Sequence, residues 1–202
     1  MNYKQRSAIV LLAAIVAVVG CSQNSEMERT STKIEKKLND KMKSGNKLSP
    51  SEINNLSGAY LFKKQYNDGI ACLEQLSNDD KYKNSKYLIY LNLSKFYLEQ
   101  TSEKTPGTEK TDLIEKANRY LALGVDSAPE KASALYARSH IYGYEGCIEK
   151  AKKDLQDARN IAQGKNSILY EEGLYVPKEK FISLLQADSD SLSKLTDNCD
   201  LH

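Results

Sequence analysis

Apolar residues recur every three or four positions along most of this chain, which is the spacing of amphipathic helices and not of strands. From position 49 onward the apolar runs are separated by short polar segments rich in Gly, Pro and Asn, which are residues that end helices and form turns. The pattern therefore predicts a series of helices joined by short turns. In the first two runs the apolar positions are Ile53, Leu56, Ala59, Tyr60 and Phe62, then Ile70, Leu73 and Leu76.

Three short polar segments have the composition of helix starts. Each places Ser or Thr where the side chain can cap a helix and Glu three residues later, the spacing of a capping box. The second segment also has a proline at the first helical position, where its missing N–H costs nothing. The three segments are Thr32 with Glu35, Ser49-Pro50 with Glu52, and Ser127 with Glu130.

One tetrapeptide occurs twice. Residues 114–117 and 148–151 both read Ile-Glu-Lys-Ala, so the two copies lie 34 positions apart. A period of this length, made of helical segments, is typical of helix pairs that bury their apolar faces by stacking on the next pair. The repeat predicts that the copies lie on equivalent helices.

The segment after Ser49 resembles the tetratricopeptide repeat (TPR) in the positions of its Leu, Tyr, small and large apolar residues. The resemblance implies an all-α fold, a TPR-like helical-hairpin solenoid of about three repeats over residues 49–195 with a C-terminal capping helix pair. Two positions depart from the pattern. Ser57 stands where the family usually has Gly or Ala, and Gly69 stands where it usually has Ala. The residues that carry the resemblance are Leu56, Tyr60, Tyr66, Gly69, Leu73 and Leu76.

Two segments interrupt the repeat. Residues Gln100 to Lys110 add about a dozen residues to one turn, and a loop of that length is uncommon unless it is functional. After Asn166 the pattern predicts a short helix over 168–175 and then a last helix from Pro177, with Phe181, Leu184 and Leu185 on its apolar side. Residues 196–202 are expected to form a flexible tail unless Cys199 is bonded.

The first residues have the features of a secretory signal. Lys4 and Arg6 precede an apolar run of 12 residues from Ala8 to Val19, too short to span a bilayer comfortably. The junction at 18–21, Val-Val-Gly-Cys, resembles the lipobox of bacterial lipoproteins. The resemblance implies a signal peptide over 1–20, a covalent lipid on Cys21, and anchoring on the periplasmic face of the outer membrane. Residues 21–48 are then expected to form a polar tether and a short helix.

Removal of such a signal changes the charge balance. Without Lys4 and Arg6 the chain has 27 basic and 27 acidic residues, so no electrostatic attraction for nucleic acid is expected. Export would permit disulfides. With Cys21 lipidated, Cys72 is expected as a small buried residue, while Cys147 and Cys199 either form a disulfide or remain free thiols.

No pattern for catalysis or a cofactor is present. His140 occupies a helical position expected to pack against its neighbours, and no partners for a metal site or a nucleophilic triad accompany it in the sequence. Glycine-rich phosphate loops and Cys-x-x-Cys pairs are also absent from the sequence. The chain is therefore expected not to be an enzyme and to need no cofactor or metal, and a reaction through His140 is the minor alternative.

The TPR resemblance implies that a protein partner binds along the concave surface lined by the first helix of each pair. Only Asn92 and Lys131 match the carboxylate-clamp pattern of that family, which argues against a clamp for a C-terminal carboxylate. The main hypothesis is a scaffold or pilotin-type assembly factor for an envelope machine, and the alternative is an immunity or inhibitor lipoprotein that uses the segment 100–110. The expected groove residues are Asn54, Leu61, Phe62, Leu88, Leu91, Asn92, Lys95, Lys131, Arg138, Ile141 and Tyr142.

Overall fold

The structure, a computed structural model, describes residues 21–102, 107–169 and 175–199. These residues form an all-α fold of helical hairpins, which confirms the fold class predicted from the apolar spacing. The helices are α2 (Cys21–Lys43), α3 (Pro50–Phe62), α4 (Tyr66–Asn78), the 3₁₀ helix η2 (Asp80–Ser85), α5 (Lys86–Ser102), α6 (Thr108–Asp126), α7 (Lys131–Tyr144), α8 (Ile148–Gln163) and α9 (Lys178–Leu192).

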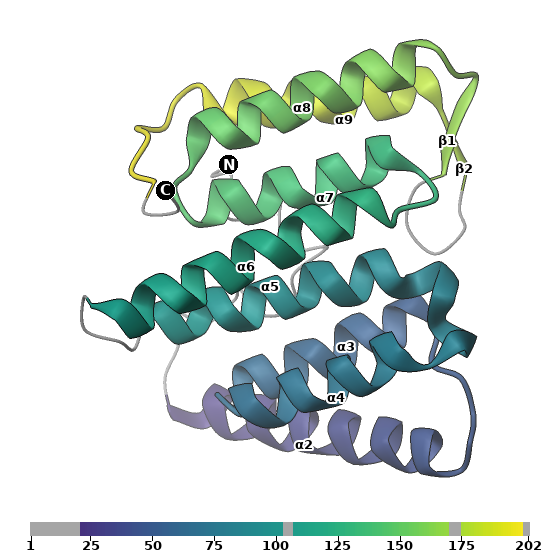
Figure 1. Ribbon diagram of the computed structural model, residues 1–202, viewed down its shortest axis with the longest axis vertical. Coiled ribbons are helices and arrows are strands. Elements are labelled where there is room, and N and C mark those ends of the chain that lie inside the picture. Colours follow the sequence, from purple (N-terminus) through teal and green to yellow (C-terminus); the bar gives the residue numbers. More distant parts are fainter. Residues whose placement is uncertain (1–20, 103–106, 170–174, 200–202) are drawn as a thin grey trace.

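Successive helices alternate in direction (Figure 1). The helices α3, α5, α7 and α9 run one way and are called the first helices below, whereas α4, α6 and α8 run the opposite way and are called the second helices. Contacts join neighbouring first helices, since Asn54 of α3 is bonded to Asn92 of α5, and the ring of Tyr136 in α7 packs edge-on against Phe181 of α9. The first helices therefore form one layer in which side chains from distant parts of the sequence meet.

Of the three predicted helix starts, the one at Ser49 is confirmed. The Glu52 amide donates to Ser49 Oγ at 3.2 Å, and the Ser49 amide donates to the Glu52 carboxylate at 2.8 Å. The other two were wrong. Ser127 ends α6, and Glu130 caps α7 by accepting from the amide of Ala132. Thr32 lies inside α2, where its hydroxyl donates to the carbonyl of Glu28.

Two glycines allow the hairpins to pack closely. A Cβ on Gly69 would lie 2.2 Å from the ring of Phe96, and one on Gly124 would lie 2.7 Å from the side chain of Leu91. Such distances are well inside van der Waals contact, so α4 and α6 approach α5 at positions where even alanine is too large. Gly69, which departs from the repeat pattern, is thus required by Phe96.

The repeated tetrapeptide lies on the second helices α6 and α8. Ala117 and Ala151 are fully buried, whereas Glu115 and Glu149 are exposed. Small buried residues at equivalent positions let each second helix approach its partner, so the repeat stabilises the packing between helices. Its glutamates face solvent, and its lysines, Lys116 and Lys150, lie over the rings of Tyr97 and Tyr142.

The N-terminal half of the chain differs from expectation in two places. The predicted signal peptide, 1–20, lies outside the described residues, but α2 begins at Cys21, so the polar tether expected before Thr32 is wrong. The expected long loop at 100–110 is also wrong in most of its length. α5 continues to Ser102 and α6 begins at Thr108, and only 103–106 lie outside the described residues. The inserted residues chiefly lengthen one helical hairpin.

The C-terminal segment also departs from the predicted helix at 168–175. The described parts form two short antiparallel strands, β1 (Ser167–Leu169) and β2 (Tyr175–Pro177), with Ile168 opposite Val176. Residues 170–174 lie outside the described residues. Both paired side chains are buried against the last helices, so pairing on a packed surface replaced the expected helix. The expected last helix is present as α9, with Phe181 and Leu185 buried.

The end of the chain is held against the start of α8. Cys147 and Cys199 form a disulfide, which decides between the two states of these cysteines that the sequence left open. The Asp197 carboxylate accepts from the amides of Ile148, at 2.6 Å, and Glu149, and the Asn198 amide donates to the carbonyl of Gly146. Residues 196–199 are therefore not the flexible tail that was predicted, because a covalent bond and a helix cap hold them.

Candidate functional site

Four of the residues expected to line a groove on the first helices lie elsewhere. Leu91 and Ile141 are buried in the core between the two helix layers. Arg138 extends toward α8, where its guanidinium forms two 2.7 Å bonds with the Asp154 carboxylate. Tyr142 lies beside it, with its ring 5.6 Å from the guanidinium carbon. Leu91 and Ile141 were wrongly assigned because they are buried in the core, and Arg138 and Tyr142 because they contact residues of α8.

The physical reason is clearest in α5. This helix is packed between α3, α4, α6 and α7, and its buried residues lie on all sides of it. Its hydrophobic pattern therefore has no single apolar side, and periodicity does not tell which residues face the other first helices. The remaining expected groove residues lie at the surface or between α3 and α5: Leu61, Phe62 and Leu88 are partly buried, Asn54 is bonded to Asn92, and Lys131 is exposed.

Side chains from four first helices instead meet in a polar row, which we call the first-helix face. It consists of Asn54, Asn92, Lys95, Glu99, Tyr136, His140, Tyr144 and Asp188. The row begins between α3 and α5, where the Asn92 amide donates to Asn54 Oδ1 at 2.8 Å. It continues between α5 and α7 and ends between α7 and α9.

Between α5 and α7, two pairs of side chains lie one helical turn apart. The Glu99 carboxylate lies near Tyr144 and is the main cause of the raised pKa of that phenol. One turn earlier, Lys95 lies near His140, and its positive charge helps to lower the pKa of the imidazole. Because α5 and α7 run in the same direction, residues at matching heights face each other along both helices.

Between α7 and α9, Asp188 joins two aromatic side chains. Tyr136 donates from its hydroxyl to Asp188 Oδ2 at 2.9 Å, and His140 Nε2 lies 3.4 Å from the same oxygen. His140 is 7% exposed, and this burial lowers its pKa, while the Asp188 charge opposes the change. The imidazole is thus neutral at neutral pH, and the expectation that His140 packs against its neighbours agrees with this geometry.

Lys95 has an electrostatic environment unlike that of the other lysines with resolved shifts. Its side chain is partly buried, and removal of water from around the ammonium lowers its pKa to about 8. Within the described part of the chain, no carboxylate lies within ion-pair distance of its Nζ. A cation in this position is costly, since neither water nor a counter-ion fully stabilises it.

The surface beside this row has free space at Gly58 of α3. A Cβ built on this glycine would meet no atom within 4 Å, whereas the glycines that allow helix packing leave no such room. Gly58 is one helical turn after Asn54, on a first helix and partly exposed. The first-helix face therefore combines an open position, a polar row and an uncompensated positive charge.

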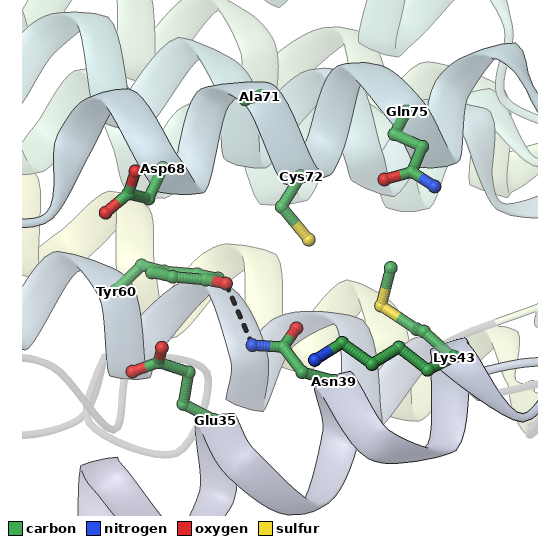
Figure 2. Close-up of a pocket in the computed structure, with 9 residues that line it drawn as sticks. Glu35, Asn39, Lys43, Tyr60, Asp68, Ala71, Cys72 and Gln75 are labelled. Atoms are coloured by element: carbon green, nitrogen blue, oxygen red, sulfur yellow. Dashed lines mark hydrogen bonds between the residues drawn. The ribbon is translucent and has the colours of Figure 1, made fainter.

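Two cavities lie away from this row. One, of about 470 Å³, is between α2 and α4, and Figure 2 shows Cys72 pointing into it opposite Asn39 and Tyr60. Cys72 is therefore partly exposed, and not the fully buried residue that was expected. Burial raises the pKa of its thiol to about 11, so the sulfur stays protonated and is a poor nucleophile at neutral pH.

The larger cavity, of about 680 Å³, lies where α3, α5 and α7 begin. Leu48, Pro50, Tyr87, Pro129 and Leu169 contribute most of its apolar wall. Its two lysines already have partners, because Lys41 bonds to the Glu52 carboxylate at 2.7 Å and Lys47 lies over the Tyr82 ring. The charged groups at this cavity thus have no need of a ligand.

Within 21–102, 107–169 and 175–199, no group of three or more His, Cys, Asp or Glu side chains is arranged to hold a metal ion. The same residues include no helix that is long and apolar enough to cross a bilayer. Comparison with protein-family models, curated proteins and solved structures finds no match to this chain.

Sequence reasoning assigned only Asn54, Asn92 and Lys95 of this face to the groove and missed the other five members, namely Glu99, Tyr136, His140, Tyr144 and Asp188. Tyr144 is a large aromatic residue with 54% of its surface exposed, and Asp188 comes from α9, which the sequence assigned to capping only. The sequence does show that Lys95 and Glu99 lie one turn apart on one helix. The parallel packing of α5, α7 and α9 brings these side chains together, and it has no signature in the sequence.

Proposed function

We propose that the chain is a non-enzymatic TPR-like lipoprotein that binds a protein partner in the bacterial cell envelope through its first-helix face. In this proposal a lipid on Cys21 holds it on the periplasmic face of the outer membrane. There it serves as an assembly scaffold or a pilotin-type factor for an envelope machine. The lipobox-like junction, the 34-residue period and the helical hairpins are consistent with this role.

One observation carries the binding proposal, namely the combination of exposed and polar groups on the first-helix face. Tyr144 is among the most exposed large apolar side chains, Gly58 borders open space, and Lys95 has no carboxylate partner among the described residues. Tyrosine supplies a large contact area at low entropic cost, and unpaired polar groups are stabilised when a partner supplies the missing charge.

A cross-linking experiment tests the binding half of the proposal. A photoreactive amino acid at position 58 has space on the first-helix face, and one at the exposed position 153 of α8 is the matched control. After irradiation of whole cells, position 58 should give a discrete adduct that position 153 does not give. Equal adducts at both positions, or none at 58, would refute binding at this face.

The anchoring half of the proposal has its own test. Cells that express the chain with a labelled fatty acid should yield a labelled protein in the outer-membrane fraction, and the Cys21→Ser variant should lose both label and membrane association. A chain that fractionates with the membrane after Cys21→Ser would show that another feature holds it there.

An immunity or inhibitor lipoprotein is the second candidate function. The observation in its favour is that α5 and α6 are longer than the other helices from α3 onward, and that the N-terminal end of α6 extends beyond the neighbouring hairpins in Figure 1. In this proposal the adjoining ends of α5 and α6 contact a toxin, so shortening both helices near Ser102 and Thr108 abolishes inhibition. Adduct formation at Gly58 that survives this shortening would instead support the scaffold.

A further inference from the structure

Lys95 is the one lysine whose pKa is shown to be lowered among the described residues, and it lies at the centre of the first-helix face. Its ammonium is between α5 and α7, beside the buried imidazole of His140. Neutral His140 does not compensate the charge of the lysine. The folded chain therefore holds a cation in a partly dry position without a counter-ion of its own from the described residues.

Carboxylates are present in the same row, but each is engaged with another group. Asp188 accepts from Tyr136 at 2.9 Å and lies 3.4 Å from His140. Glu99 interacts with Tyr144. Both acids are directed to aromatic partners, so they do not neutralise Lys95. Among the described residues the ammonium has no carboxylate partner, and it can interact with a group that approaches the first-helix face.

The charges around Lys95 limit what that group can be. Glu99 follows Lys95 by one turn of α5, and Asp188 contacts the neighbouring His140 from α9, so a polyanion such as a phosphate cluster or a nucleic acid backbone would be repelled. A single carboxylate adds one negative charge, matches the ammonium and leaves room for an apolar neighbour beside Tyr144. Gly58, one turn after Asn54 on the neighbouring first helix, provides space for an adjoining peptide backbone.

We propose that Lys95 is the receptor for an aspartate or glutamate side chain of an acidic protein segment that lies across α5 and α7. This inference depends on the proposed function, because it names the chemistry of the partner at the same face. The partner carboxylate supplies the missing counter-ion, and its binding favours the charged form of the lysine.

The test uses the mature chain with two short blocked peptides, one of alternating Glu and Ala and one of alternating Gln and Ala. Binding is measured by NMR on the ¹³C-methylated lysines, which reports both affinity and the titration of each amine. The Glu–Ala peptide should raise the pKa of Lys95 above about 8, its value in the folded chain without peptide. The Gln–Ala peptide should leave it unchanged.

Two substitutions separate this role from a structural one. Lys95→Met should weaken binding of the Glu–Ala peptide by about tenfold or more, which is the loss expected for one partly desolvated ion pair. Lys153→Met removes an exposed lysine of α8 and should leave the affinity unchanged. Because Lys95→Met removes a costly charge, the variant should unfold at the same or a higher temperature, so lost binding is not lost folding.

Three results of the titrations with purified protein would overturn the inference: equal affinity of wild type and Lys95→Met for the Glu–Ala peptide, equal binding of both peptides, or an equal pKa shift with inorganic phosphate. The last would assign the site to small anions in general. If Lys95→Met keeps its cross-linked adduct at position 58, the partner binds without this ion pair. The scaffold proposal then stands while the inference fails. If instead the Glu–Ala peptide raises the pKa of Lys95 but no adduct forms at position 58, the carboxylate site stands and the scaffold proposal fails.

Discussion

Removal of the disulfide between Cys147 and Cys199 should destabilise the whole domain. The bond joins residues 52 positions apart, and cross-linking a loop of that length lowers the entropy of the unfolded chain by an amount equal to about 4 kcal/mol. For a chain of this size, about 4 kcal/mol corresponds to a decrease in Tm of roughly 10 °C. The perturbation is the double substitution Cys147→Ala with Cys199→Ala.

The disulfide also holds a helix cap in place. Cys147 is the N-cap residue of α8, but its side chain accepts no hydrogen bond there, and the Asp197 carboxylate bonds to the amide of Ile148 instead. Asp197→Ala alone should cost about 1 kcal/mol, the usual value of an N-cap. In the variant without the disulfide, Asp197 is no longer fixed near α8, so the same substitution should cost much less.

The assay is urea unfolding followed by far-UV circular dichroism for the four proteins of this double-mutant cycle. Cys72→Ala is the matched control, because it removes a cysteine without affecting the bond, and it should lose far less stability. A double cysteine variant within about 1 kcal/mol of wild type would refute the entropic argument. Equal effects of Asp197→Ala in both backgrounds would show that the cap does not depend on the disulfide.

Three further predictions concern packing and charge. Gly58→Ala should stabilise the chain by about 0.5–1 kcal/mol, whereas Gly69→Ala should destabilise it, because a Cβ has open space at position 58 and would overlap the Phe96 ring at position 69; thermal unfolding of both variants decides this. Lys95→Met should stabilise the chain by about 1–3 kcal/mol at neutral pH. In the unfolded chain Lys95 keeps its proton up to about pH 10.4, and in the folded chain only up to about pH 8, so the stability of the wild type rises with pH between these two values. The stabilisation gained by Lys95→Met should therefore shrink over the same range. Urea unfolding of both proteins at about pH 8 and about pH 10.4 checks the sign. Arg138→Ala should cost about 3–5 kcal/mol by leaving the buried Asp154 carboxylate unpaired, and adding Asp154→Ala should recover much of the loss in the same assay.

The local pattern of the sequence determined the helices and some of their ends. Apolar spacing predicted a chain of helical hairpins, and the Ser49 capping box forms as expected, because these signals depend on neighbours within one or two helical turns. The local pattern gave a wrong prediction at residues 168–175, where Ile168 pairs with Val176 of the neighbouring strand on the packed surface of the last helices. There a contact with distant residues outweighed the local preference.

Which residues form the candidate site was decided by tertiary structure alone. The sequence showed that Lys95, His140 and Asp188 lie on separate helices, but their meeting depends on the direction and rotation of α5, α7 and α9. The apolar residues of α5 lie on all sides of the helix, so its periodicity does not specify which side faces the other first helices. Leu91 was therefore wrongly assigned to the open face. Gly69 and Gly124 set how closely the neighbouring helices approach α5. That packing, which no local pattern encodes, determines which side chains face one another.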